Sequence, residues 1–372
     1  MSRNPAEHSI VSLKQSSSND AMPTFDRETG IYEYKASHVL PIVFGCLLSL
    51  SLGMHIYQNF HYRFWKITFW MFWGSLVYVV GWILRAISSY NPQHLNLYIA
   101  GTIFIYAAPP IFSASAYNIL GRIMHYIPMF AWLNPNRTVY FFVYIGVLVE
   151  GLTAAGGARI ATGAKEVEKY RSGAILMAIS VILQCVVEVA LVGVVASLHR
   201  KCARQGMAPR NLRFVFYTLY GTSALVLVRC LYRAVESLYT IDPPNVDCND
   251  TCQYFQTKEW LLYAFDAAPM VLFAFWINLM HPGRYLPRDK TRYLDFDGVT
   301  ERMGPGWLDS RPKIETFIDP LDLAGIMQKN KHHTKYWEEP LRWLACEDAF
   351  TTGTASNVKR RSRVLPKLNA AV

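Results

Sequence analysis

Charged side chains are scarce in this chain: they make up 17% of its 372 residues, whereas 52% of the residues are hydrophobic. The sequence also has no P-loop for nucleotides, no G-x-S-x-G nucleophile elbow and no H-E-x-x-H zinc motif. These absences argue against a built-in ATPase and against common hydrolase classes. We therefore predict a protein that is not an enzyme, with no catalytic residue, metal site or cofactor.

What the chain has instead is a series of apolar segments separated by short polar loops. Each has about the roughly 20 apolar residues that a helix needs to cross a bilayer. They cover residues 38–58, 67–87, 97–121, 138–162, 173–198, 213–236 and 259–280. The pattern predicts an all-α, polytopic membrane protein built as a bundle of seven transmembrane helices.

The remaining sequence divides the chain into three regions. Residues 1–37 are expected to form a flexible extracellular N-terminus, 38–284 the transmembrane domain, and 285–372 a cytosolic, largely disordered tail. Residues 1–36 are polar and lack the apolar core of a signal peptide, so the first span is expected to act as the insertion signal.

The positions of Lys and Arg predict the orientation of the bundle. Twelve of these residues flank the spans in the stretches 63–66, 122–137, 200–210 and 284–292, against six on the opposite side. Basic residues favour the cytosolic side, which places the N-terminus outside and the C-terminus in the cytosol. Because the net charge of +10 is placed at span ends, we expect membrane lipid as a partner and no nucleic acid.

The loop after the sixth span has features of an extracellular segment. Cys248 and Cys252 are close enough in sequence to bridge in an oxidising compartment. Between them lies Asn249-Asp250-Thr251, an acceptor sequence for N-glycosylation. A bridge across so short a loop is strained, so the disulfide and the free thiols stay as alternatives.

Ionisable residues within spans are costly in lipid and are candidates for function. Arg229, Arg233 and Glu236 share one face of the sixth span, at spacings of four and three residues. Arg85 lies near the outer end of the second span. At 1.5 Å rise per residue, Arg229 and Asp266 both lie about 10 Å below the outer surface, so they can pair. Such a pair is either structural or part of a site for a substrate headgroup.

Two glutamates lie deeper in the predicted bilayer. Glu150 is on the fourth span, and Glu188 is on the fifth, four residues after Gln184. Neither has a basic neighbour close in sequence. A neutral carboxyl that can ionise suits proton coupling or the binding of a cationic amine.

Four stretches, in order and on the expected spans, carry a resemblance to a known family. They read VGWILRAIS (80–88), APPIFSASAYNILGRI (108–123), LVRCLYRAVE (227–236) and FDAAPMVLFAFWINLMHPGRYL (265–286). Residues 38–287 thereby resemble the fungal lipid-translocating exporter family, the Rta-type seven-span proteins. The fourth span departs from the family pattern: Gly146 and Thr153 stand where relatives carry Asp and Gln, and Glu150 lies about one turn from each.

The resemblance implies a plasma-membrane protein that moves or exports lipid-like molecules. Sphingoid long-chain bases are its best-known substrate class, and other members are linked to resistance against toxic amphiphiles. The residues expected to contact such a substrate are Arg85, Glu150, Glu188, Arg229, Arg233, Glu236 and Asp266.

Two other classes of protein stay open. The first is a seven-span receptor or sensor whose cytosolic tail recruits regulators; deleting the tail at about Asp289 would abolish its output but spare a transporter. The second is an intramembrane enzyme, which rests only on His55, His125 and His281 near the inner side.

Overall fold

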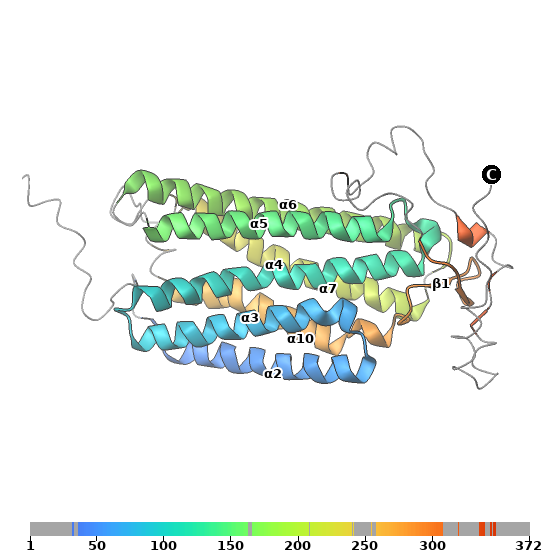
Figure 1. Cartoon of the computed structure of the whole chain (residues 1–372), viewed down its shortest axis with the longest axis horizontal. Helices are drawn as coiled ribbons and strands as arrows, with labels where there is room; N and C mark the ends of the chain where they lie inside the picture. Colours follow the sequence, from blue (N-terminus) through green and yellow to red (C-terminus); the bar gives the residue numbers. More distant parts are fainter. Residues whose placement is uncertain are drawn as a thin grey trace, which may run out of the picture.

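The computed structural model describes most of the apolar part of the chain and parts of the tail. The residues described are 32, 36–162, 166–207, 209–239, 241, 254, 258–307, 319, 335–338, 343, 345 and 346. Within them, seven helices are long and apolar enough to cross a membrane, and they run along the long axis of the molecule (Figure 1). The predicted all-α bundle of seven spans is confirmed.

Six of the spans are single helices, and the seventh is composite. The first six are α2 (Val39–Tyr62), α3 (Trp65–Tyr90), α4 (Leu95–Tyr126), α5 (Pro135–Thr162), α6 (Val167–Arg204) and α7 (Arg210–Tyr239). The seventh consists of α9 (Glu259–Leu261), a π-helical stretch η2 (Leu262–Ala267) and α10 (Ala268–Leu279). Single 3₁₀ turns are η1 (Pro128–Phe130), η3 (Pro282–Arg284) and η4 (Tyr336–Glu338).

The helices are longer than the apolar segments that predicted them. The clearest case is α6, which has 38 residues where a span over 173–198 was predicted. At 1.5 Å per residue it exceeds a hydrocarbon core of about 30 Å. The helix therefore continues at both ends outside the lipid. There the sequence is polar, so hydropathy does not indicate where the helix ends.

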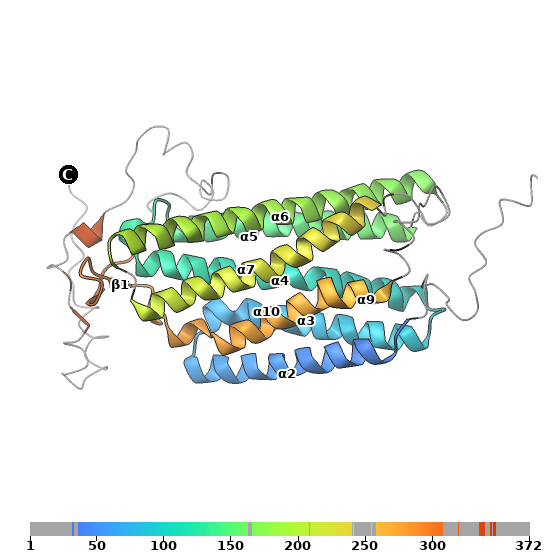
Figure 2. The same ribbon diagram turned by 180° about the vertical axis from the view of Figure 1, so that it is seen from behind.

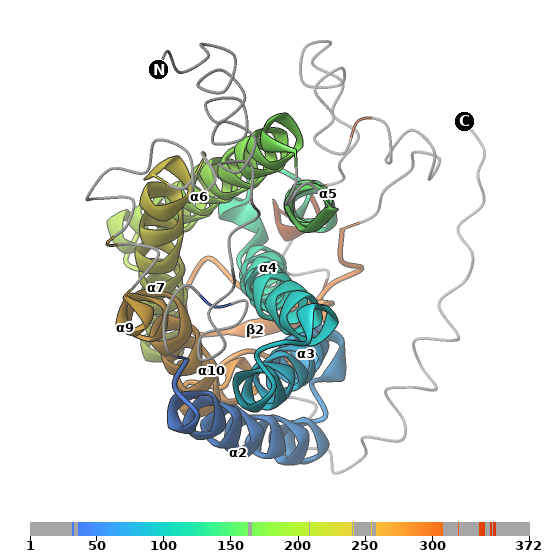
Figure 3. The ribbon, with the colours of Figure 1, turned by 90° about the vertical axis from the view of Figure 1, so that its left-hand side faces the viewer.

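Consecutive helices pack against each other, and α10 closes the bundle by packing against both α7 and α2 (Figures 2 and 3). In addition to its neighbours in sequence, α4 contacts α6 and α7. Nearly all of its residues from Phe112 to Tyr126 are buried. The side chains of α4, α6, α7, η2 and α10 therefore line the interior of the bundle.

The two ends of the bundle differ, and we name them by what they carry. The tail end carries the connections around residues 63–64, 127–134 and 205–207 and the segment 285–307 (Figure 1). The far end carries the start of α2 and of α9 (Figure 2). The basic residues predict that the tail end is cytosolic. That sidedness remains a prediction.

Part of the predicted tail is ordered against the bundle. Strands β1 (Arg292–Leu294) and β2 (Glu301–Met303) form an antiparallel hairpin, and β1 packs against α4. Tyr126 of α4 donates a 2.9 Å hydrogen bond to Glu301, and Tyr293 is fully buried. The largely disordered tail predicted for 285–372 therefore contains an ordered hairpin. The hairpin was not predicted because strands of three residues are too short to show a pattern in the sequence.

Small residues set the distance between α5 and α6. Gly156 of α5 and Gly173 of α6 face each other: a Cβ atom on Gly156 would lie 2.8 Å from the Gly173 carbonyl oxygen, and one on Gly173 would lie 2.7 Å from the Gly156 oxygen. Backbones in contact cannot yield to a new methyl group. This is the close helix packing that small residues permit in membranes.

Two neighbouring substitutions on α5 should have opposite effects. Gly156→Ala is expected to destabilise the protein by about 1–3 kcal/mol, the usual result of overpacking. Gly157→Ala should leave stability unchanged or raise it by up to about 1 kcal/mol, because nothing lies within 4 Å of its Cβ position and alanine favours helix. Thermal unfolding in detergent measures both. Equal shifts for the two variants would contradict this packing.

Candidate functional site

A buried carboxylate near the far end organises the largest group of charges in the described bundle. Asp266 lies in η2 and is 0% exposed. Arg233 of α7 donates to both of its oxygens, from Nε at 2.9 Å and from Nη2 at 2.8 Å. Arg229, one turn earlier on α7, has its Nε 2.8 Å from Asp266 Oδ1 as an ion pair whose N–H is not aligned for a hydrogen bond. The pairing of Arg229 with Asp266 that their depths suggested is present, with Arg233 as a second partner.

Arg233 also connects this carboxylate to its surroundings. Its Nη1 lies 2.5 Å from Glu236 Oε2 and donates to Tyr106 of α4 at 2.6 Å. The guanidinium lies over the Tyr106 ring, 4.4 Å from the ring centroid. One arginine thus ties α7 to α4 and to the seventh span. Charge-assisted, two-pronged contacts of this kind are stronger than neutral hydrogen bonds.

A second ion pair lies closer to the far end. Arg85 of α3 and Glu259 of α9 are 3.0 Å apart. Glu259 also accepts hydrogen bonds from the Tyr263 hydroxyl at 3.0 Å and from the Ser37 backbone at 2.8 Å. Glu259 is not among the residues predicted from the sequence, because it is the first residue of the seventh apolar segment. The available signal was depth, since Arg85 and Glu259 both lie near the outer ends of their spans.

These charges balance without any ligand. Three arginines (Arg85, Arg229, Arg233) face three carboxylates (Glu236, Glu259, Asp266), and each arginine has at least one ion pair. Removing one partner of a buried pair is far more costly than the net stabilisation that the intact pair provides. The arrangement can therefore hold α7, α3 and the seventh span together in a bundle that contains no substrate.

Glu188 of α6 is placed differently. It is 1% exposed and lies where α6 meets α4 and α7, beside Tyr117 and Ser223. Its Oε2 atom has no hydrogen-bond partner in the described part of the chain, and neither has Nε2 of Gln184 one turn away. A buried polar atom without a partner is costly, so this group is poised to accept a donor from outside the protein.

Glu150 of α5 is the second interior carboxylate. It is half-buried, and its Oε2 atom has no hydrogen-bond partner among the described residues. Arg229 is close enough to attract it electrostatically but does not form an ion pair with it. The structure therefore separates the seven predicted substrate-binding residues into two sets. Arg85, Arg229, Arg233, Glu236 and Asp266 have ion-pair partners. Glu150 and Glu188 form no ion pair with any residue that the structure describes.

A model of the family described as RTA1 like protein matches residues 71–289. The chain belongs to the RTA1-like family. The resemblance seen in its four sequence stretches is thereby confirmed. The matched segment contains all seven predicted substrate-binding residues and Glu259, and leaves α2 outside.

Curated relatives agree with this membership. A lipid-translocating exporter-like protein RTA1 of Leptosphaeria maculans is 29% identical over 317 residues, which cover 82% of this chain and 61% of the relative. One of Ajellomyces capsulatus is 29% identical over 286 residues, covering 72% and 84%. A probable lipid transporter, atnI, of Emericella nidulans is 24% identical over 300 residues, covering 74% and 76%. The chain thus spans about three fifths of the Leptosphaeria relative. No solved structure matches the chain.

With seven apolar helices, this RTA1-like chain is a multi-pass membrane protein. Of the histidines considered for an intramembrane enzyme, His55 and His281 are close enough to interact electrostatically, whereas His125 lies beside Asn136. Nε2 of His125 lies 3.2 Å from Asn136 Oδ1, and His281 Nδ1 accepts from the Gly283 backbone. Among the described residues, no group of three His, Cys, Asp or Glu side chains is placed to hold a metal ion.

The predicted disulfide and glycosylation site, at Cys248, Cys252 and Asn249, lie in a segment outside the described residues. The disulfide and the glycosylation site therefore stay predictions. The described cysteines, Cys46, Cys185, Cys202, Cys230 and Cys346, are free thiols.

Proposed function

We propose that this protein is a translocator that moves lipid-like amphiphiles across or out of the plasma membrane, with sphingoid long-chain bases as its substrate class. The observation that carries the proposal is Glu188, a carboxylate buried among transmembrane helices whose Oε2 atom has no hydrogen-bond partner among the described residues. The names of the fungal relatives support the lipid part of the proposal.

The chemistry of a long-chain base fits this position. Such a molecule has an amine, two hydroxyls and an apolar tail. Glu188 can accept the amine, and the hydroxyls of Ser113, Tyr117 and Ser223 lie on the helices that face it. The tail can remain in lipid. Because Glu188 is 1% exposed, α6 and α7 must separate for the headgroup to reach it.

The energy source follows from the motifs of the chain. Without a nucleotide-binding loop, uphill movement requires an ion gradient; otherwise the protein equilibrates its substrate between the two leaflets. Export of toxic amphipathic compounds, and hence drug resistance, would follow from the same mechanism. No enzymatic step is part of the proposal.

The runner-up function is a receptor whose tail binds cytosolic regulators. The hairpin of β1 and β2 favours it, since Tyr126 and Glu301 connect the bundle directly to the tail. Tyr336 and Trp337 pack on Tyr293 of the hairpin, and the Cys346 backbone donates a hydrogen bond to Glu301. Truncation after Cys346 keeps the hairpin together with these contacts and removes the rest of the tail, so it separates the two functions more cleanly than truncation at Asp289. A translocator keeps its transport after this truncation, whereas a receptor loses its output.

The decisive experiment uses purified full-length protein in liposomes. We expect protein-dependent flipping of a fluorescent sphingoid base, measured with and without a proton gradient. Protein truncated after Cys346 should flip the base at a rate within about twofold of the full chain. Folded protein that fails to accelerate flipping under either condition would contradict the proposal and favour the receptor.

A further inference from the structure

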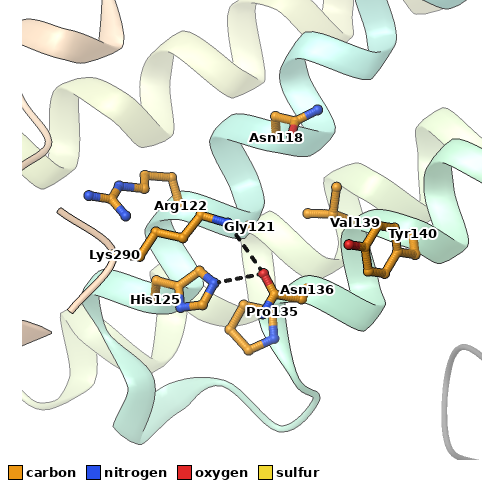
Figure 4. A pocket seen from close by; sticks show the side chains of 9 residues that line it. All are labelled: Asn118, Gly121, Arg122, His125, Pro135, Asn136, Val139, Tyr140 and Lys290. Carbon is orange, nitrogen blue, oxygen red and sulfur yellow. Dashed lines mark hydrogen bonds between the residues drawn. The ribbon is translucent and has the colours of Figure 1, made fainter. Parts of the chain in front are cut away.

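A pocket lies at the tail end of the bundle, between α4, α5 and the segment that follows α10 (Figure 4). Its volume is about 110 Å³, enough for several water molecules. The polar side chains that line it are Asn118, Arg122, His125, Asn136, Tyr140 and Lys290, and none of the described lining residues is acidic. The pocket therefore combines space with positive charge.

Two donors in the pocket converge on one neutral oxygen. The Lys290 ammonium lies 3.5 Å from Asn136 Oδ1, and His125 Nε2 lies 3.2 Å from the same atom (Figure 4). A lysine ammonium forms a stronger and shorter hydrogen bond with a charged oxygen than with an amide. An anion in the pocket can therefore replace the Asn136 oxygen as the acceptor.

Arg122 adds a buried positive charge. It is 3% exposed, and its Nε and Nη2 atoms both donate to the Pro287 carbonyl oxygen, while Nη1 has no partner in the described part of the chain. Asp289 attracts Arg122 electrostatically but does not form a direct ion pair with it. A buried charge whose contacts are neutral is costly, and a nearby anion would lower that cost.

The position of the pocket points to a lipid headgroup. Pro135 and Asn136, which line it, form the first turn of α5, where the helix dipole favours an anion. Tyr140 and Trp132 are exposed nearby, as aromatic side chains are at the level of lipid headgroups. Basic pockets between transmembrane helices are known binding places for anionic headgroups.

We propose that this pocket binds a phosphate group, presented by the phosphomonoester headgroup of an anionic lipid. A soluble phosphate shares the chemistry and is the alternative source. Lys290 contacts the phosphate, Arg122 supplies the buried charge, and His125 and Asn118 complete the polar lining. The site is independent of the transport proposed above, and its test measures binding alone.

The test titrates full-length protein in detergent with three probes, and calorimetry reports the binding. The probes are dioctanoyl phosphatidic acid, inorganic phosphate, and dioctanoylglycerol, which has the same chains and no phosphate. Lys290→Gln is expected to weaken phosphatidic acid binding at least about tenfold, because a charge-assisted hydrogen bond is lost. Lys290→Arg should bind within a few-fold of the unmodified protein.

Arg288→Gln is the matched control, since Arg288 is exposed, lies two residues from Lys290 and does not line the pocket. This variant should weaken phosphatidic acid binding by no more than about fivefold, which is the effect of removing one basic residue from the positive electrostatic potential near an anionic lipid. Binding of phosphatidic acid alone assigns the site to lipid, and equal binding of inorganic phosphate assigns it to a soluble ligand. The proposal is overturned if neither phosphatidic acid nor inorganic phosphate binds, or if dioctanoylglycerol binds as tightly as phosphatidic acid. It is also overturned if Lys290→Gln and Arg288→Gln weaken phosphatidic acid binding equally.

Discussion

Replacing Asp266 by asparagine should destabilise the protein more than any other single change in the described charge cluster. Two buried arginines, Arg229 and Arg233, would lose their shared carboxylate. Breaking a buried ion pair typically costs about 3 kcal/mol or more. For a domain of this size, that corresponds to a midpoint of thermal unfolding lower by roughly 6–12 °C, measured in detergent.

The matched control is Glu236→Gln. Glu236 is more exposed than Asp266, and Arg233 keeps both contacts with Asp266 when Glu236 is neutral. The expected loss is about 1 kcal/mol or less, as for ion pairs near solvent. An Asp266→Asn variant as stable as the unmodified protein would show that the cluster does not hold the helices together. A loss of transport in such a variant would then identify Asp266 as a contact of the substrate.

Replacing Glu188 by glutamine should have the opposite signature, with transport lost and stability kept. A charged hydrogen bond to a substrate amine is worth about 1.5–3 kcal/mol, so flipping of a sphingoid base should fall at least about tenfold. The unfolding midpoint should stay constant or rise, because a buried carboxylate that forms no ion pair with the described residues becomes a neutral amide of the same shape. Flipping in liposomes and thermal unfolding together measure the two effects.

Glu168→Gln provides the control for Glu188. Glu168 is exposed at the start of the same helix, so its neutralisation changes the net charge equally without touching the interior. Transport should be unchanged in this variant. If Glu188→Gln and Glu150→Gln both leave transport and its pH profile unchanged, neither interior carboxylate takes part, and the proposed substrate contact is wrong.

Depth in the membrane was predictable from the sequence, and rotation about the helix axis was not. Counting residues from the span ends placed Arg229 and Asp266 at the same level, and the structure pairs them. The count could not show that Arg233, one turn away, provides the stronger contact. The reason is the π-helical stretch η2, which changes the direction in which Asp266 points relative to a regular α-helix.

The ends of the helices show a similar limit. Hydropathy located each span because lipid demands an unbroken apolar stretch. It could not locate the ends of α6, which continue as helix after the sequence becomes polar. The hairpin of β1 and β2 was missed for a related reason, since its stability comes from packing against α4 rather than from its own short strands.

By itself, the sequence determined that this protein spans a membrane seven times and belongs to the RTA1-like family. Each apolar segment must satisfy its own backbone hydrogen bonds as a helix, which makes the spans a local property. Only the tertiary structure decided which charges are neutralised by ion pairs and which, like Glu188, have no ion pair among the described residues. It also decided that Arg122, Asn136 and Lys290 line one pocket. These groups come from three separate segments, and only the packing of the helices brings them together.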